Sequence, residues 1–187
     1  MQIGLFTWYY IMSGDLSSSY VLTAKELPPS QSTFPASSLP GPTVAFQYTL
    51  DGVVTNIREF GSQNDFGPDT KLNISQCRKS DFQYWVIPPY MTPSLLLGEL
   101  NKIVPVSEAR FSDIILSNDD IIVKVSGVPS EKVPVTTYNI STSKTQVINC
   151  TISMSGVNWL SLSNGQCKGA WAKVWVDWMK MDCRTHI

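Results

Sequence analysis

The sequence is poor in the residues on which most enzymes and nucleic-acid-binding proteins depend. It has one histidine, His186, and only 16% of its residues are charged, against about 25% in an average globular protein. A nucleophilic triad needs a base, usually histidine, beside the nucleophile, and the chain has no Gly-x-Ser-x-Gly elbow or phosphate-binding glycine loop. The net charge is −1 and the longest basic cluster is Arg78-Lys79, whereas binding nucleic acid needs a basic patch. We therefore expect no catalytic residue, no cofactor and no nucleic-acid partner.

Ligands for a metal ion are also scarce. The four cysteines show no Cys-x-x-Cys spacing, and His186 is the only histidine that could join them. Residues 118–120 (Asn-Asp-Asp), and separately Asp65 with Asp69, offer oxygen atoms of the kind that calcium prefers. Neither group matches an EF-hand loop, and Asn and Asp favour turns for reasons unrelated to metals. We expect no metal site.

No apolar run approaches the roughly 20 residues that a membrane-spanning helix needs. The most apolar stretch, residues 3–12, is followed by small residues and resembles the core and cleavage region of a signal peptide. No Lys or Arg precedes Lys25, so the positive region that normally opens a signal peptide is missing. Two interpretations of residues 1–24 stay open: a signal peptide, or the first strand of the mature domain.

The chain does carry signs of an oxidising secretory compartment. Three N-glycosylation sequons begin at Asn73, Asn139 and Asn149. In such a compartment cysteines can also pair. The sequence therefore predicts a secreted, extracellular glycoprotein.

Two disulfides are expected from the four cysteines, and three pairings are possible. Cys150 with Cys167 would close a hairpin across the turn at Ser155-Gly156. Cys77 would then pair with Cys183 and tie the end of the chain to its middle. The other two pairings stay open at this point.

The expected organisation has three parts. Residues 1–24 form the apolar N-terminal segment, and residues 25–43 form a linker, because five prolines and four serines between positions 27 and 42 do not support regular structure. Residues 44–187 form the domain. In that part, short segments rich in β-branched and aromatic residues alternate with turn residues, as in sandwiches and barrels. We predict an all-β fold, an antiparallel β-sandwich of immunoglobulin-like or jelly-roll type with little helix.

Particular elements can be assigned within the domain. Residues 44–50 and 53–58 flank Asp51-Gly52, which is typical of a hairpin with a type I′ turn. Residues 103–106 are expected to form an edge strand, because Pro105 cannot donate to a ladder. A turn or two of helix is possible at 95–102 and 107–113. Further strands are expected at residues 82–87, 120–126, 132–138, 146–153, 157–162 and 170–178.

The last of these strands suggests a binding face. Alternation along residues 170–178 puts Trp171, Lys173, Trp175 and Asp177 on one side. Flat rings beside a donor and an acceptor can stack on sugars or anchor a protein. Alternatively, these tryptophans cover a second sheet or an interface in a larger assembly.

The function expected from the sequence is therefore binding of an extracellular carbohydrate or protein by a non-catalytic domain. One alternative is an ancillary β-domain, or a fragment, of a secreted glycoside hydrolase, since two carboxylates suffice for that chemistry. Another is a structural subunit of a surface assembly. The oligomeric state stays open. Carboxylates that are candidates by residue type alone are Glu59, Glu99, Glu108, Asp113 and Asp177.

Overall fold

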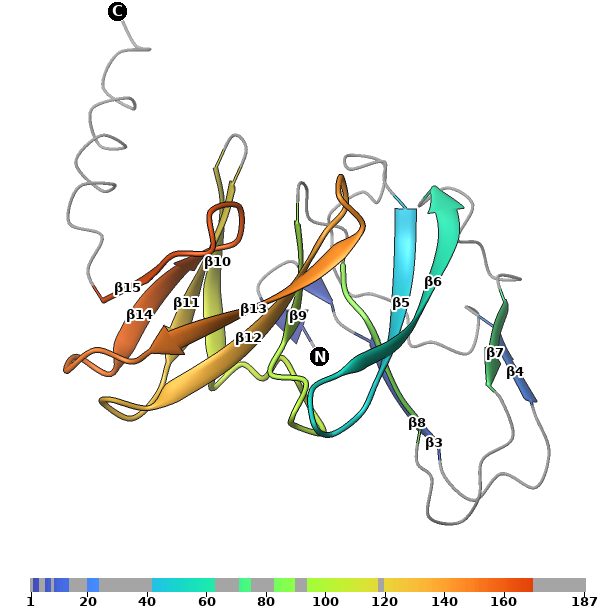
Figure 1. Ribbon diagram of the computed structural model, residues 1–187, viewed down its shortest axis with the longest axis horizontal. Helices are drawn as coiled ribbons and strands as arrows, with labels where there is room; N and C mark the ends of the chain where they lie inside the picture. The colour runs from blue at the N-terminus through green and yellow to red at the C-terminus, as the bar shows by residue number, and fades with distance from the viewer. Residues whose placement is uncertain are drawn as a thin grey trace, which may run out of the picture.

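In the part of the chain that the structure describes, every regular element is a β-strand (Figure 1). The computed structural model describes residues 2–3, 6–7, 9–13, 20–23, 42–62, 71–74, 83–89, 94–117 and 120–169. The strands are β1 (Gln2–Ile3), β2 (Phe6–Thr7), β3 (Tyr9–Ser13), β4 (Tyr20–Thr23), β5 (Pro42–Tyr48), β6 (Val54–Ser62), β7 (Lys71–Ile74), β8 (Gln83–Ile87), β9 (Ser94–Gly98), β10 (Phe111–Ser117), β11 (Asp120–Ser126), β12 (Lys132–Asn139), β13 (Lys144–Thr151), β14 (Val157–Ser161) and β15 (Cys167–Lys168).

All of the strand pairs are antiparallel. The three larger sheets have the orders β10-β11-β14-β15, β13-β12-β9 and β3-β8-β5-β6, and β1-β2 and β4-β7 form two-stranded sheets. The predicted all-β, sandwich-like fold is thus confirmed. Where one or two helical turns seemed possible, the chain instead forms β9, a series of turns and the start of β10. The described part of the chain contains no helix with the length and hydrophobicity that a bilayer crossing requires.

The sheet β13-β12-β9 lies between the other two large sheets (Figure 1). On one of its faces Cys150 is bonded to Cys167 of β15, in the sheet that contains β14. On the other face the ring of Tyr138 lies edge-on to Phe46 of β5, with 4.9 Å between ring centroids. One buried hydrophobic cluster therefore runs through all three sheets, from Val86 on β8 to Leu160 on β14.

The hairpin predicted around Asp51-Gly52 is present, because β5 and β6 pair across it. The predicted type I′ turn is wrong, however. That turn needs positive φ at both central residues, and only Gly52 has one, at 84°. The amide of Gly52 donates to the carbonyl oxygen of Thr49 at 2.9 Å, and the amide of Thr49 donates to the carbonyl oxygen of Val53 at 2.9 Å. The hairpin therefore closes with a longer turn, and Gly52 alone takes the left-handed conformation.

The edge strand predicted at residues 103–106 is also wrong. These residues belong to a loop that folds back on the end of β9, where the amide of Glu99 donates to the carbonyl oxygen of Pro105 at 2.9 Å. The fold-back depends on Gly98, which has φ of 82°, and a Cβ at this position would lie 2.3 Å from the same carbonyl oxygen. Pro105 thus uses its acceptor within the loop and pairs with no strand.

The domain boundaries given in the sequence analysis stay predictions. Residues 9–13 form β3, which pairs with β8, and residues 24–41 lie outside the described residues. The expected strand at 170–178 lies outside them as well.

Candidate binding surface

The face predicted to bind a ligand, formed by Trp171, Lys173, Trp175 and Asp177, falls outside the described residues and stays a prediction. The aromatic side chains that the structure does describe are mostly core. Trp85, Tyr138 and three others, Phe46, Tyr48 and Phe111, are each no more than 2% exposed. Burial, and the neighbouring Tyr84, raise the pKa of the Tyr48 phenol. Among the described side chains, the large exposed apolar ones include no aromatic residue.

Several of the acidic residues considered for catalysis or calcium have structural partners, whereas Asp65, Asp69 and residues 118–119 lie outside the described residues. Glu59 accepts a hydrogen bond from the hydroxyl of Tyr138 at 3.3 Å, and Asp113 pairs with Lys124 at 2.8 Å. Asp120 accepts from the backbone amides of Ile121 and Ser163, at 2.7 and 3.0 Å, and also from the hydroxyl of Ser161. Among the described residues no three His, Cys, Asp or Glu side chains cluster as metal ligands. Glu108 lies on the surface, and Asp177 lies outside the described part of the chain.

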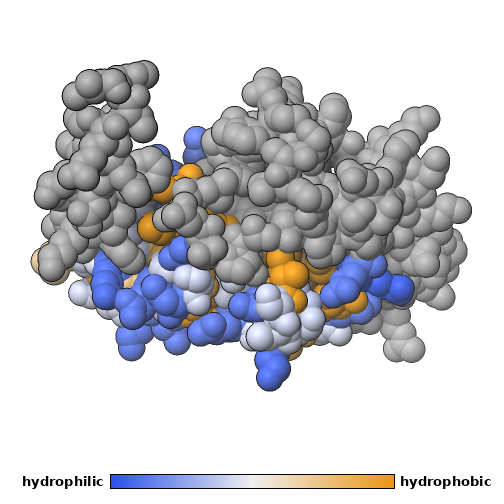
Figure 2. Space-filling model, turned by 90° about the horizontal axis from the view of Figure 1, so that it is seen from above, coloured by the Kyte–Doolittle hydropathy of each residue, from blue (hydrophilic) through white to orange (hydrophobic). Residues whose placement is uncertain are grey.

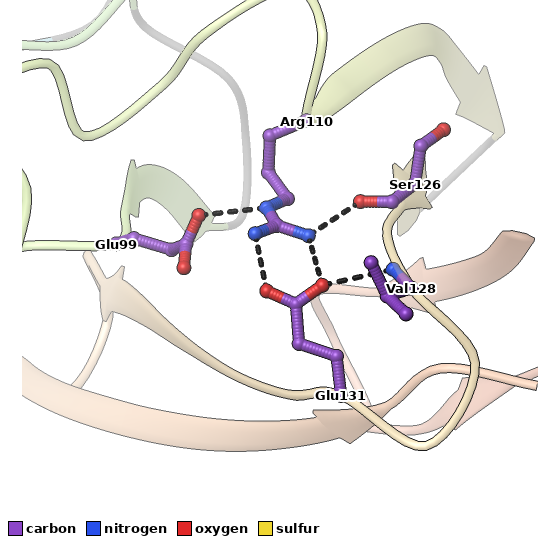
Figure 3. A network of polar contacts seen from close by, with 5 residues as sticks. All are labelled: Glu99, Arg110, Ser126, Val128 and Glu131. Atoms are coloured by element: carbon purple, nitrogen blue, oxygen red, sulfur yellow. Dashed lines mark hydrogen bonds and ion pairs between the residues drawn. The ribbon is translucent and has the colours of Figure 1, made fainter. Parts of the chain in front are cut away.

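The densest polar network surrounds Arg110, just before β10 (Figure 3). Its Nε donates to Glu99 at 2.8 Å, and its two terminal nitrogens donate to the two carboxylate oxygens of Glu131. Nη1 also donates to the carbonyl oxygen of Ser126 at 2.7 Å. Gly127 leaves room for this arrangement, because a Cβ there would lie 2.4 Å from Nη1.

This network is a cluster of ion pairs in which Glu99 and Glu131 share Arg110. The hydrogen bonds from Arg110, together with the bond from the amide of Val128, lower the pKa of Glu131 to about 2. Both carboxylates are therefore directed at one guanidinium, which joins the end of β9 to the turn before β12. The low pKa of Glu131 does not suit the proton-holding carboxyl group that a hydrolytic pair needs near neutral pH.

A surface that the sequence did not reveal lies where two loops meet. Leu50 and Val53, in the turn between β5 and β6, are 42% and 57% exposed, and Ile103 and Val104, in the loop after β9, are 56% and 46% exposed. The loops are neighbours, because a Cβ on Gly52 would lie 3.8 Å from the amide nitrogen of Asn101. We call these four residues the apolar tip.

A hydrogen bond and two buried residues hold the Ile103-Val104 part of the apolar tip. Tyr48 donates its hydroxyl hydrogen to the carbonyl oxygen of Ile103 at 3.5 Å, and the next residues, Pro105 and Val106, are buried. The loop is thus anchored on both sides of the exposed pair. In Figure 1 the β5–β6 turn and the loop after β9 lie together at the lower edge. Figure 2 shows the molecule from above, the side opposite this edge, where the described surface is largely hydrophilic with small interrupted hydrophobic areas.

One signal for the apolar tip was present in the sequence. Leu50 and Val53 sit directly beside a turn, where aliphatic side chains have little chance of reaching a core. The partner loop carried the opposite signal, since Ile103-Val104 followed by Pro105 is also the pattern of an edge strand. The meeting of the two loops depends on the way the sheets stack.

The predicted modification sites are distributed over three strands, β7, β12 and β13. Asn149 is exposed on β13, and Asn139 closes β12, where its Oδ1 accepts from the amide and the hydroxyl of Thr142 at 2.9 and 3.1 Å. Asn73 lies in β7, but its side chain is outside the described part.

The Cys150–Cys167 disulfide is present, with 5.3 Å between the Cα atoms. Cys77 and Cys183 lie outside the described residues.

Comparisons of this chain with protein-family models, with curated proteins and with solved structures found no match.

Proposed function

We propose that this protein is a secreted, non-catalytic β-sandwich glycoprotein that binds an extracellular protein through the apolar tip. The observation that carries the proposal is the group of four aliphatic side chains, Leu50, Val53, Ile103 and Val104, held exposed on two adjacent anchored loops. Exposed apolar groups that gather in one place are typical of protein interfaces. Three sequons and the Cys150–Cys167 disulfide support the secretory part.

The chemistry of the tip favours a protein over a carbohydrate. Sugar rings stack on flat aromatic faces, whereas the tip is aliphatic and the described aromatic side chains are buried or half-buried. Carbohydrate binding would therefore have to use Trp171 and Trp175, which lie outside the described residues.

A membrane surface is also disfavoured as the partner. Binding to anionic lipids is supported by clustered Lys and Arg beside the apolar residues. Here the charged residues of the two loops are Asp51, Glu99, Lys102, Glu108 and Arg110, three acidic and two basic. The tip thus has no excess of positive charge to attract anionic lipids. It suits an apolar pocket on a protein in which both acidic and basic residues surround the pocket.

The proposal can be tested with a charge placed in the tip. The chain, secreted from a glycosylating host, is assayed against a panel of purified extracellular domains and against a glycan array. Val53→Asp and Ile103→Asp should each weaken protein binding about tenfold or more, since a buried unpaired charge costs several kcal/mol at an interface. Val128→Asp and Met154→Asp are matched controls, because these residues are 70% and 85% exposed and lie outside the tip.

Three outcomes would contradict the proposal. One is binding to glycans that is lost on Trp171→Ala or Trp175→Ala, with no protein bound. Another is protein binding that survives both tip variants. The third is a chain from the secretory pathway that carries no glycan and has free Cys150 and Cys167 thiols.

A further inference from the structure

Within the described part of the chain, one sheet ends in a strand whose outer edge is largely unpaired. In the sheet β13-β12-β9 the strand β13 is at the end of the order. Asn149 on β13 is paired with Pro134 on β12. Proline has no N–H, so the two residues cannot exchange the hydrogen bonds of a bonded antiparallel pair. The N–H and C=O of Asn149 therefore point away from β12.

Backbone N–H and C=O groups alternate in direction along an antiparallel strand, so the orientation of Asn149 also fixes that of the other β13 residues. Groups that point away from β12 recur every second residue, at Thr145, Val147, Asn149 and Thr151. The hydrogen bonds just beyond β13 fit this alternation, because both backbone groups of Ile152 point toward β12. Its amide donates to the carbonyl oxygen of Glu131, and its carbonyl oxygen accepts from the amide of Ser130, both at 2.8 Å. At one end the outer edge is closed, since Asn158 donates from Nδ2 to the carbonyl oxygen of Thr151 at 2.9 Å. Within the described part of the chain, the outward backbone groups of the other three residues have no hydrogen-bond partner.

Sequence and exposure make this edge suited to pairing. Residues 145–151 contain no charged side chain, and Val147 is 54% exposed. Uncharged, β-branched edge strands are templates for association, and proteins usually block them with charges or bulges. Two other edges in this fold are blocked in that way. The edge strand β6 presents exposed Arg58 and Glu59, and β10 has a bulge between Ser112 and Ile115.

We propose that an N-glycan on Asn149 closes the β13 edge, and that without this glycan β13 pairs with β13 of a second copy of the chain. The inference rests on the glycoprotein part of the proposed function. Asn149 and Thr151, the first and last residues of the sequon, are both exposed, so the side chain can carry a glycan in the folded protein. The edges at β6 and β10 have protein-encoded protection, whereas on β13 the modification site lies in the unprotected segment itself.

The dimer expected without the glycan has a defined geometry. Two antiparallel copies of one strand are related by a twofold axis, so each contact occurs twice. Centred on Val147, this arrangement pairs Val147 with Val147 of the second copy and Asn149 with Thr145 of the second copy. A glycan on each Asn149 would then stand beside the other chain at both ends of the new ladder and prevent the approach.

The experiment compares sequon variants of the full chain secreted from a glycosylating host. Asn149→Gln and Thr151→Ala both remove the sequon, and Thr151→Ser keeps it as the matched control. Glycopeptide mass spectrometry should find glycan on Asn149 in the wild type and in Thr151→Ser only. Size-exclusion chromatography with light scattering should show monomers for these two proteins. For Asn149→Gln and Thr151→Ala the mass should double as concentration rises.

A second pair of variants tests the site of association. Adding Val147→Lys to Asn149→Gln should restore the monomer, because two like charges would face each other on the axis. Adding Val128→Lys or the tip change Val53→Asp should leave the dimer intact. Hydrogen exchange at the amides of Val147 and Asn149 should slow in the dimer.

Several results would overturn the inference: an unmodified Asn149 in the secreted protein, monomeric Asn149→Gln and Thr151→Ala proteins at all concentrations, or a dimer that persists with Val147→Lys. The failure of the proposed function would look different. If glycan is found on Asn139 but not on Asn149, only the edge inference falls. If tip variants bind the protein partner normally while the β13 dimer forms as expected, only the proposed binding surface falls.

Discussion

Arg110 and Glu131 face each other as a two-pronged ion pair, with both terminal nitrogens of the guanidinium bonded to the two oxygens of the carboxylate. The pair connects the residue before β10 to the residue before β12, which are 21 positions apart. A second carboxylate, Glu99, is bonded to Nε of the same guanidinium and is only 7% exposed. Arg110 thus forms ion pairs with two carboxylates simultaneously, the buried Glu99 and the partly exposed Glu131.

Loss of Arg110 should therefore be costly. Arg110→Ala leaves the Glu99 carboxylate buried without its charged partner, and breaking a buried pair in this way costs about 3 kcal/mol or more of unfolding free energy. Lys124→Ala is the matched control, because it breaks an ion pair whose Asp113 side chain is 57% exposed, and such pairs contribute about 1 kcal/mol at most. Urea unfolding of both variants measures the difference. Equal losses would show that the Arg110 network stabilises the fold no more than an exposed ion pair does.

The same network should make stability depend on pH in acid. Glu131 has a folded-state pKa of about 2, below its usual 4.5, so its ionised form is favoured by folding. Its contribution is fully present above pH 4.5 and is lost as pH falls through 2. Thermal unfolding of the wild type between pH 5 and 2 should show a fall in Tm that is smaller in Glu131→Gln. Glu108→Gln makes the same chemical change on an exposed residue and should keep the wild-type fall.

Two glycines with the same backbone conformation should differ in tolerance. Gly98 and Gly52 have φ of 82° and 84°, which costs other residues about 1–2 kcal/mol. At Gly98 an added Cβ would also lie 2.3 Å from the backbone oxygen of Pro105, whereas at Gly52 its nearest neighbour is 3.8 Å away. Gly98→Ala should thus cost about 1–3 kcal/mol more than Gly52→Ala, the additional cost of overpacking. Equal melting temperatures for the two variants would contradict the fold-back of the loop after β9.

The disulfides give a prediction that can be read by peptide mapping. Non-reducing digestion should yield one peptide pair that joins Cys150 to Cys167, and by elimination another that joins Cys77 to Cys183, with no alkylated cysteine. Replacing both Cys150 and Cys167 by alanine opens a loop with a sequence separation of 17. Loops of about this size lose about 3 kcal/mol of stability when their disulfide is removed. Mixed pairings or alkylated Cys150 would contradict the prediction.

Local features of the fold could be predicted wherever neighbouring residues carry the information. The strand at residues 120–126 was expected with the bounds that β11 has, because its β-branched run is framed by turn residues. The Cys150–Cys167 pair was one of three pairings left open, and the hairpin expected to support it is absent, because β13 and β14 lie in different sheets that this bond links. The position of the turn at Gly52 was predicted correctly, but its type was wrong. A glycine with positive φ occurs in hairpin loops of different lengths, so it does not by itself specify the turn type.

The sequence by itself determined the all-β class and most of the strand positions, because alternation, β-branching and turn residues act over a few positions. Only the tertiary structure decided which loops and charges meet. Tyr48 reaches the carbonyl of Ile103 across 55 positions, and Tyr138 reaches Glu59 across 79. Such contacts depend on how sheets stack and which strands stay at their edges. The apolar tip, the Arg110 network and the open edge of β13 all arise at that level, where no single segment carries the information.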